Sequence, residues 1–163
     1  MRHVVPTWLL VALLAGLPLL ACAPLAGSQT ASDREAQDQQ LILTALHDRR
    51  YADAIAATRR AGASRAEIDF AVGVLALEGL ADRDARQRPL ESAAQAIVLI
   101  EAAAQVGYRQ AVSALADTFA RGVHSGVDGA VLVAADMRLS SCWEAVKAQS
   151  LSASNCVVMR TGR

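Results

Sequence analysis

The sequence predicts an all-α protein, a short α-solenoid of antiparallel helical hairpins. Apolar residues over positions 91–122 recur at intervals of three and four, the spacing that places them on one face of a helix. Gly107 and Gly122 interrupt this pattern, as residues with a left-handed backbone do at the C-terminal ends of helices. The stretch is therefore typical of two helices joined by a short turn.

A second observation supports the solenoid. Residues 68–79 repeat the small and apolar positions of residues 111–122 at a distance of 43 residues. Supersecondary units repeated at this spacing are the sequence signature of stacked helical hairpins, in which each unit buries its apolar face against the next.

The same region carries a run of small and apolar residues at fixed spacing. Its members are Ala96, Leu99, Ala103, Ala104, Gly107, Ala111, Leu115, Ala116, Phe119 and Gly122. This run resembles the Sel-one-like repeat, a branch of the tetratricopeptide superfamily. Leu99 stands where that family commonly has Trp, Ala116 where it has Gly, and Phe119 where it has Tyr. The resemblance implies a non-enzymatic adaptor that binds proteins on a concave helical face.

Length and charge narrow the possible functions. The 163 residues allow one compact domain or a short array, and not two large domains. The formal net charge is zero, whereas a domain that binds nucleic acid is usually strongly basic. We therefore expect no nucleic-acid partner.

Residues 1–21 have the features of an export signal. Residues 8–17 form an uninterrupted apolar or small core, and Pro18 follows it. Because a transmembrane helix needs about 20 apolar residues, an export signal is favoured over a retained membrane anchor.

Cys22 specifies the kind of signal. Residues 19–22 resemble the bacterial lipobox, in which the cysteine is lipidated and becomes the mature N-terminus. The alternative is ordinary cleavage after Ala23, but Pro24 would then directly follow the cut. Ala23 after the cysteine implies, by resemblance to known sorting, outer-membrane delivery. We expect a lipid-anchored protein that faces the periplasm.

The first half of the mature chain is expected to form a tether and a hairpin. Residues 22–31 lack periodicity and are typical of a flexible tether or of a disordered terminus. Residues 32–62 form the N-terminal helical hairpin. Ser32 and Glu35 have the spacing of a capping box at its start, and residues 47–50 form its polar turn.

Residues 63–163 are assigned to the Sel-one-like repeat region with a C-terminal capping helix. Ser64 and Glu67 form a second capping-box pattern, and the helix that they begin is expected to run through Glu78. Residues 79–89 are polar and charged, which indicates a solvated loop. The alternative is a loop that binds a partner.

The C-terminal part of this region is predicted to be a loop followed by a helix. Residues 123–129 hold two glycines directly after Gly122 and indicate a loop, and residues 130–149 resume helical character. We predict no strand anywhere in the chain.

The chain offers little catalytic chemistry. It has three histidines but neither a His-x3-His nor a Cys-x2-Cys spacing, so we expect no metal and no cofactor. His124 and Asp128 place an imidazole and a carboxylate in one loop. They motivate the alternative of a cell-wall-acting enzyme or glycan binder.

Aromatic residues are few and fall near helical apolar positions. Tyr51, Phe70, Tyr108 and Phe119 are expected to pack in the core rather than to form a ligand cage. Trp143 lies in a more polar run, so it is the aromatic residue that we consider as an anchor of a protein interface.

Cys142 and Cys156 remain once Cys22 is lipidated. An even pair in an exported chain predicts a disulfide, with residues 150–155 as the turn that brings Cys156 back. Residues 157–159 would then cover the apolar end of the last hairpin. Two free thiols or an intermolecular bond are the alternatives.

The sequence thus predicts an envelope adaptor with an unidentified protein partner. A dedicated inhibitor or immunity protein with one tight partner is the main alternative, and the sequence does not separate the two.

Lipidation at Cys22 makes the first testable prediction. In detergent phase partitioning of the protein expressed in a Gram-negative bacterium, we expect the wild type in the detergent phase, because several acyl chains anchor a protein stably. Cys22→Ser should remain uncleaved, or be cleaved elsewhere and partition into water. A wild-type protein found in the aqueous phase would contradict the lipobox assignment.

Overall fold

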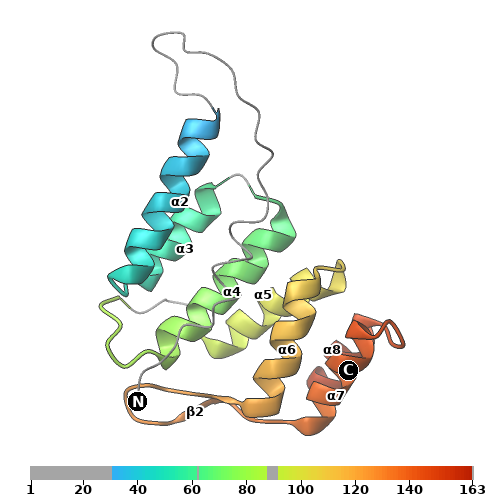
Figure 1. The fold of residues 1–163 in the computed structure, drawn as a ribbon. Helices are drawn as coiled ribbons and strands as arrows, with labels where there is room; N and C mark the ends of the chain where they lie inside the picture. The colour runs from blue at the N-terminus through green and yellow to red at the C-terminus, as the bar shows by residue number, and fades with distance from the viewer. Residues whose placement is uncertain (1–30, 62, 88–91, 163) are drawn as a thin grey trace.

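The computed structural model describes residues 31–61, 63–87 and 92–162 (Figure 1). The all-α prediction is confirmed: these residues form seven helices and one two-stranded antiparallel sheet. In chain order the elements are α2 (Ala31–His47), α3 (Tyr51–Arg60), α4 (Arg65–Ala81), α5 (Ala93–Gln105), α6 (Arg109–Arg121), β1 (Val123–His124), β2 (Val131–Val133), α7 (Met137–Lys147) and α8 (Ala153–Thr161).

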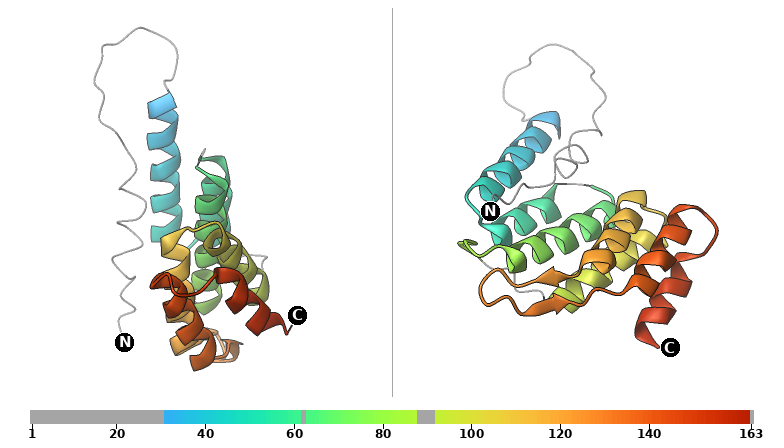
Figure 2. Two further views of the ribbon diagram at one scale, coloured as in Figure 1. Left: turned by 90° about the vertical axis from the view of Figure 1, so that its right-hand side faces the viewer. Right: turned by 60° about the horizontal axis from the view of Figure 1, so that its bottom comes forward.

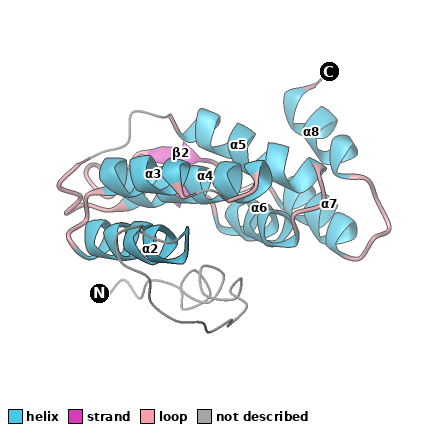
Figure 3. Ribbon diagram, turned by 90° about the horizontal axis from the view of Figure 1, so that it is seen from above, coloured by secondary structure: helices cyan, strands magenta, loops and turns pink. Residues whose placement is uncertain are grey.

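The helices pack mainly in the order of the chain. Each one contacts the next, and the contact between α4 and α5 is the most extensive. The last helix, α8, contacts α7 and also reaches back to α5. Two further views show the same succession of neighbouring helices (Figure 2). Seen from above, α2 and α8 lie at opposite ends of the array (Figure 3).

Helices α4 and α5 each begin with a capping box, in which side chains bond to the first backbone N–H groups. The predicted capping box at Ser64 and Glu67 is confirmed, with the Ser64 N–H donating to Glu67 Oε2 at 2.9 Å and the Glu67 N–H donating to Ser64 Oγ at 3.3 Å. These bonds lower the pKa of the Glu67 carboxyl, the Ser64 hydroxyl having the largest effect. Ser92 and Gln95 form a second capping box at α5, which the sequence analysis did not identify.

The helix predicted near Ser32 is present, and its described start lies slightly before the predicted cap; the side chains of the predicted capping box, Ser32 and Glu35, lie outside what the structure describes. Helix α2 begins at Ala31, so Ser32 lies within its first turn, and the tether predicted over residues 22–31 includes the first helical residue. The predicted signal peptide, residues 1–21, and the lipidation site Cys22 lie outside the described residues.

Glycines end two helices and lie inside a third. Gly107 and Gly122 have φ of 88° and 71°, the left-handed backbone that the sequence predicts after α5 and α6. The prediction that the helix starting after Ser64 ends at Glu78 is wrong, because α4 continues to Ala81 with Gly79 buried inside it. A glycine that permits close packing looks the same in a sequence as one that ends a helix.

A β-hairpin replaces part of the predicted C-terminal helix. Residues 131–133 are extended and pair with β1, where Val123 lies opposite Val133. The expectations of no strand and of a helix starting at residue 130 are both wrong. The β-branched valines favour the extended backbone. The turn also lies against α4: the Gly126 N–H donates to the Leu80 carbonyl oxygen, and the Ala81 backbone leaves no room for a Cβ at Gly126.

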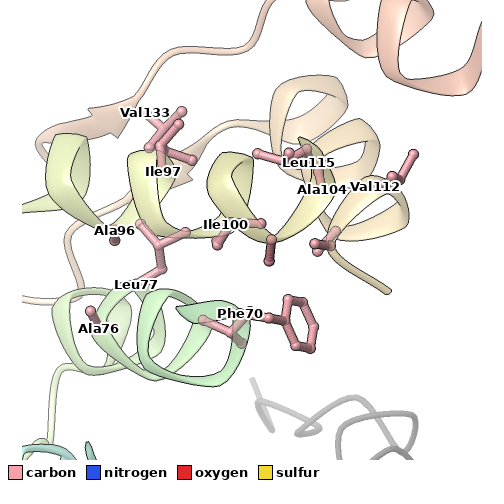
Figure 4. Close-up of a cluster of buried hydrophobic side chains, with 14 of the residues drawn as sticks. Phe70, Ala76, Leu77, Ala96, Ile97, Ile100, Ala104, Val112, Leu115 and Val133 are labelled. Atoms are coloured by element: carbon pink, nitrogen blue, oxygen red, sulfur yellow. The ribbon is translucent and has the colours of Figure 1, made fainter. Parts of the chain in front are cut away.

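The core is closely packed where α4 meets α5. A Cβ at Gly73 would lie 2.6 Å from Cγ1 of Ile100 and 2.7 Å from the carbonyl oxygen of Ala96. Figure 4 shows Ala96 and Ile100 facing α4 in this region. Ala103 and Ala104, which belong to the run of small and apolar residues in the sequence, are buried at 0% and 2% exposure. Small side chains therefore let the two helix backbones approach closely.

This contact generates a second prediction. Gly73→Ala should gain about 1 kcal/mol in helix propensity. It should lose up to about 3 kcal/mol through overpacking, because the Ala96 carbonyl belongs to the backbone and moves only with α5. We expect a net loss of about 1–2 kcal/mol in the free energy of unfolding, measured by urea denaturation.

The control is Ala102→Gly in α5, at a half-buried position. This change measures the effect of helix propensity alone, without overpacking. If Gly73→Ala stabilises the protein instead, α4 and α5 are not in the close contact described.

Candidate functional site

The two predicted cysteines lie together where α8 meets α7. Their sulfur atoms are 2.01 Å apart, at disulfide distance, and their Cα atoms are 5.7 Å apart. Cys142 is 5% exposed and Cys156 is fully buried. The structure thus brings together the pair that the sequence analysis selected, in the core of the C-terminal end.

The segment around Cys156 differs from the prediction. The turn expected over residues 150–155 is shorter, because α8 begins at Ala153 and carries Cys156 on a helix. Val157 is partly buried against the core, but Val158 and Met159 are 53% and 48% exposed and do not cover the last hairpin. Only one face of α8 packs against the core, and Val158 and Met159 lie on the exposed side of the helix.

An ion pair between a buried carboxylate and a partly exposed guanidinium also holds α8. Arg160 donates from Nε to Glu101 Oε1 at 2.6 Å and from Nη2 to Glu101 Oε2 at 2.7 Å. Glu101 lies on α5 and is 3% exposed. These hydrogen bonds raise the pKa of the Arg160 guanidinium. Two parallel charge-assisted bonds of this kind fix both position and orientation.

This ion pair was not predicted from the sequence. Its members are 59 residues apart, so no local pattern connects them. The available signal was Glu101 itself, the one charged residue of α5, which lies beside Ile100 in an apolar stretch of that helix. A charge at such a position needs a partner, because burying an unpaired carboxylate is costly.

Helix α8 depends on these two attachments. Ala153, Cys156 and Arg160 lie three, then four residues apart and share one face. A helix of nine residues is too short to be stable alone in water. Removing Arg160 with α8 still in place would leave the Glu101 carboxylate without this partner and weaken the attachment of α8, by less than the loss of a fully buried pair because the Arg160 side chain is 26% exposed.

Trp143 belongs to the core and is not an exposed interface anchor. Its side chain is fully buried on α7, in one stripe with Leu139 and Cys142. Its Nε1 has no hydrogen-bond partner among the described residues. The surrounding serines misled the sequence analysis, because helical spacing places Leu139 and Trp143 on one face despite them.

The other aromatic residues behave largely as expected. Phe70 and Tyr108 are in ring contact, with centroids 5.2 Å apart. Phe119 is buried, and Tyr51 is partly buried with its hydroxyl donating to Asp82 Oδ2 at 3.0 Å. Burial and this hydrogen bond raise the pKa of Tyr51.

The charged loop after α4 is clamped to the α2–α3 turn. Arg49 donates from Nη1 to Asp82 Oδ1 at 3.0 Å and to Asp84 Oδ2 at 2.8 Å. The carbonyl oxygen of Arg49 accepts from the Arg86 N–H at 3.0 Å. The Arg49 side chain is 47% exposed, so its ion pairs contribute little energy each. The described part of this loop therefore connects the first hairpin to α4.

The loop that motivated an enzymatic alternative is an exposed hairpin turn. His124 lies on β1 with its side chain exposed, and Asp128 accepts a hydrogen bond from the Ala130 N–H at 3.1 Å. Across residues 31–61, 63–87 and 92–162, no three His, Cys, Asp or Glu side chains are grouped as a metal ion would require.

None of the helices that the structure describes combines the length and apolar character that crossing a membrane requires. No protein-family model, curated protein or solved structure matches the chain. The Sel-one-like resemblance of residues 96–122 and the lipobox therefore stay predictions from the sequence.

Proposed function

We propose that the chain is a lipid-anchored interaction module of the bacterial cell envelope, which holds a partner protein on its concave helical face. The observation that carries this proposal is the packing of helices in chain order, each against the next. An array of this kind presents side chains from several helices on one continuous surface, and such surfaces hold extended or helical segments of other proteins.

Exposed apolar side chains on the helices support the proposal. Val98 on α5 is 52% exposed, and Leu41 on α2 is 46% exposed. Both lie within helices whose opposite faces are buried, so the backbone that carries them is rigid. The lipobox at Cys22 would hold this surface at a membrane, where a partner in the envelope meets it.

The test is site-specific photo-crosslinking in cells that express the full chain with Cys22 intact. A photoreactive amino acid replaces Val98 or Leu41 in turn, and replaces exposed Lys147 near the end of α7 as the matched control. We expect a discrete adduct with an envelope protein from at least one of the first two positions, and not from position 147.

Cys22→Ser in the same cells should lose the adduct if anchoring brings the partner close. One partner in a fixed ratio would identify a dedicated inhibitor, and several partners would identify an adaptor. The absence of a discrete adduct from positions across all the helices would contradict the proposal.

A further inference from the structure

Helix α8 is attached to the array through a narrow stripe. Of its nine residues only Ala153 and Cys156 are buried, and most of the others face solvent. Its fixed connections are the disulfide to Cys142 on α7 and the ion pair from Arg160 to Glu101 on α5. The rest of the core, centred on α4 and α5, is formed by residues outside α8.

The disulfide is shielded from reductants by α8. Cys142 is 5% exposed and Cys156 is fully buried, so a thiolate from solution has little access to the disulfide while α8 is in place. Cys156 and Arg160 are one helical turn apart on the same face of α8. A movement of α8 that exposes the sulfur atoms therefore also breaks the bonds between Arg160 and Glu101.

We infer that α8 is a redox-controlled latch, in which the Glu101–Arg160 ion pair limits reduction of Cys142–Cys156 and reduction releases α8 while α4 and α5 stay packed. This inference goes beyond the proposed function and does not depend on it.

The reductant that the latch requires is a dithiol. One thiolate of the dithiol attacks a sulfur of the disulfide, which breaks the Cys142–Cys156 bond and forms a mixed disulfide. The second thiolate of the reductant then displaces the remaining protein thiolate. The reductant leaves as an internal disulfide, and the protein gains two electrons and two protons as two thiols.

Release of α8 does not leave Glu101 as an unpaired buried charge. Water replaces the guanidinium of Arg160 around Glu101, so the carboxylate becomes hydrated rather than unpaired in the core. Once the disulfide is reduced, the nine-residue α8 is held only by the ion pair and two small buried side chains. Because so few contacts remain, we expect α8 to detach from α5 and α7.

The first test measures the rate of disulfide reduction in the full chain. The protein is held in detergent with excess dithiothreitol, the thiols are alkylated at timed intervals, and peptide mass spectrometry separates Cys142 and Cys156 from Cys22. We expect Arg160→Ala to be reduced about tenfold faster or more than the wild type. Arg160→Lys should be intermediate, because an ammonium keeps the charge but not the paired hydrogen bonds.

The control is Arg121→Ala, which removes an exposed ion pair with Asp117 on α6. Its reduction rate should match the wild type. Equal rates for Arg160→Ala and the wild type would overturn the inference, and so would an equal acceleration by Arg121→Ala.

The second test needs no variant. Hydrogen exchange followed by mass spectrometry compares the oxidised and reduced wild-type protein. Exchange in residues 153–161 should rise on reduction, while exchange in residues 65–81 and 93–105 should stay slow. Unchanged exchange in residues 153–161 would overturn the latch, and so would a rise of similar size in all three segments, because that result means global unfolding.

Discussion

The close approach of α4 and α5 is the constraint on which the rest of the structure depends. A side chain at Gly73 would collide with Ile100 and with the backbone at Ala96. Helix α4 in turn packs against α3, while α5 packs against α6, β2 and α8. A wider separation of the two central helices would shift every one of these contacts, because a close-packed interior transmits small displacements.

The two ends of the array are attached by different means. At the N-terminal end, Arg49 joins the α2–α3 turn to Asp82 and Asp84 through partly exposed ion pairs, which are worth about 0–1 kcal/mol each. At the C-terminal end, a buried disulfide and the buried carboxylate of Glu101 hold α8. The first end is therefore held by weak contacts in addition to its packing, and the second by strong contacts over a small area.

Sequence patterns that act over one or two helical turns predicted most of the fold. The spacing of apolar residues located the helices, and Ser64 and Gly107 marked a helix start and a helix end, because both depend on local backbone chemistry. The selection of Cys142 and Cys156 followed from counting cysteines in a chain that the sequence predicts to be exported.

Long-range features were missed because no local pattern encodes them. The bond of Glu101 to Arg160 spans 59 residues. Val131–Val133 forms a strand because it pairs with β1 next to α4, although its apolar residues also suit a helix. Gly79 was assigned to a loop, since its buried position in α4 depends on helices distant in the sequence.

Native-state hydrogen exchange of the oxidised protein tests the central place of α4 and α5 most directly. Buried amides of α4 and α5, such as those of Val72, Ala76 and Ile100, should exchange only through global unfolding, while amides of α2 and α8 should exchange through local openings of lower free energy. If the amides of α4 and α5 exchange as readily as those of α2 or α8, the two helices do not form the core that organises the array.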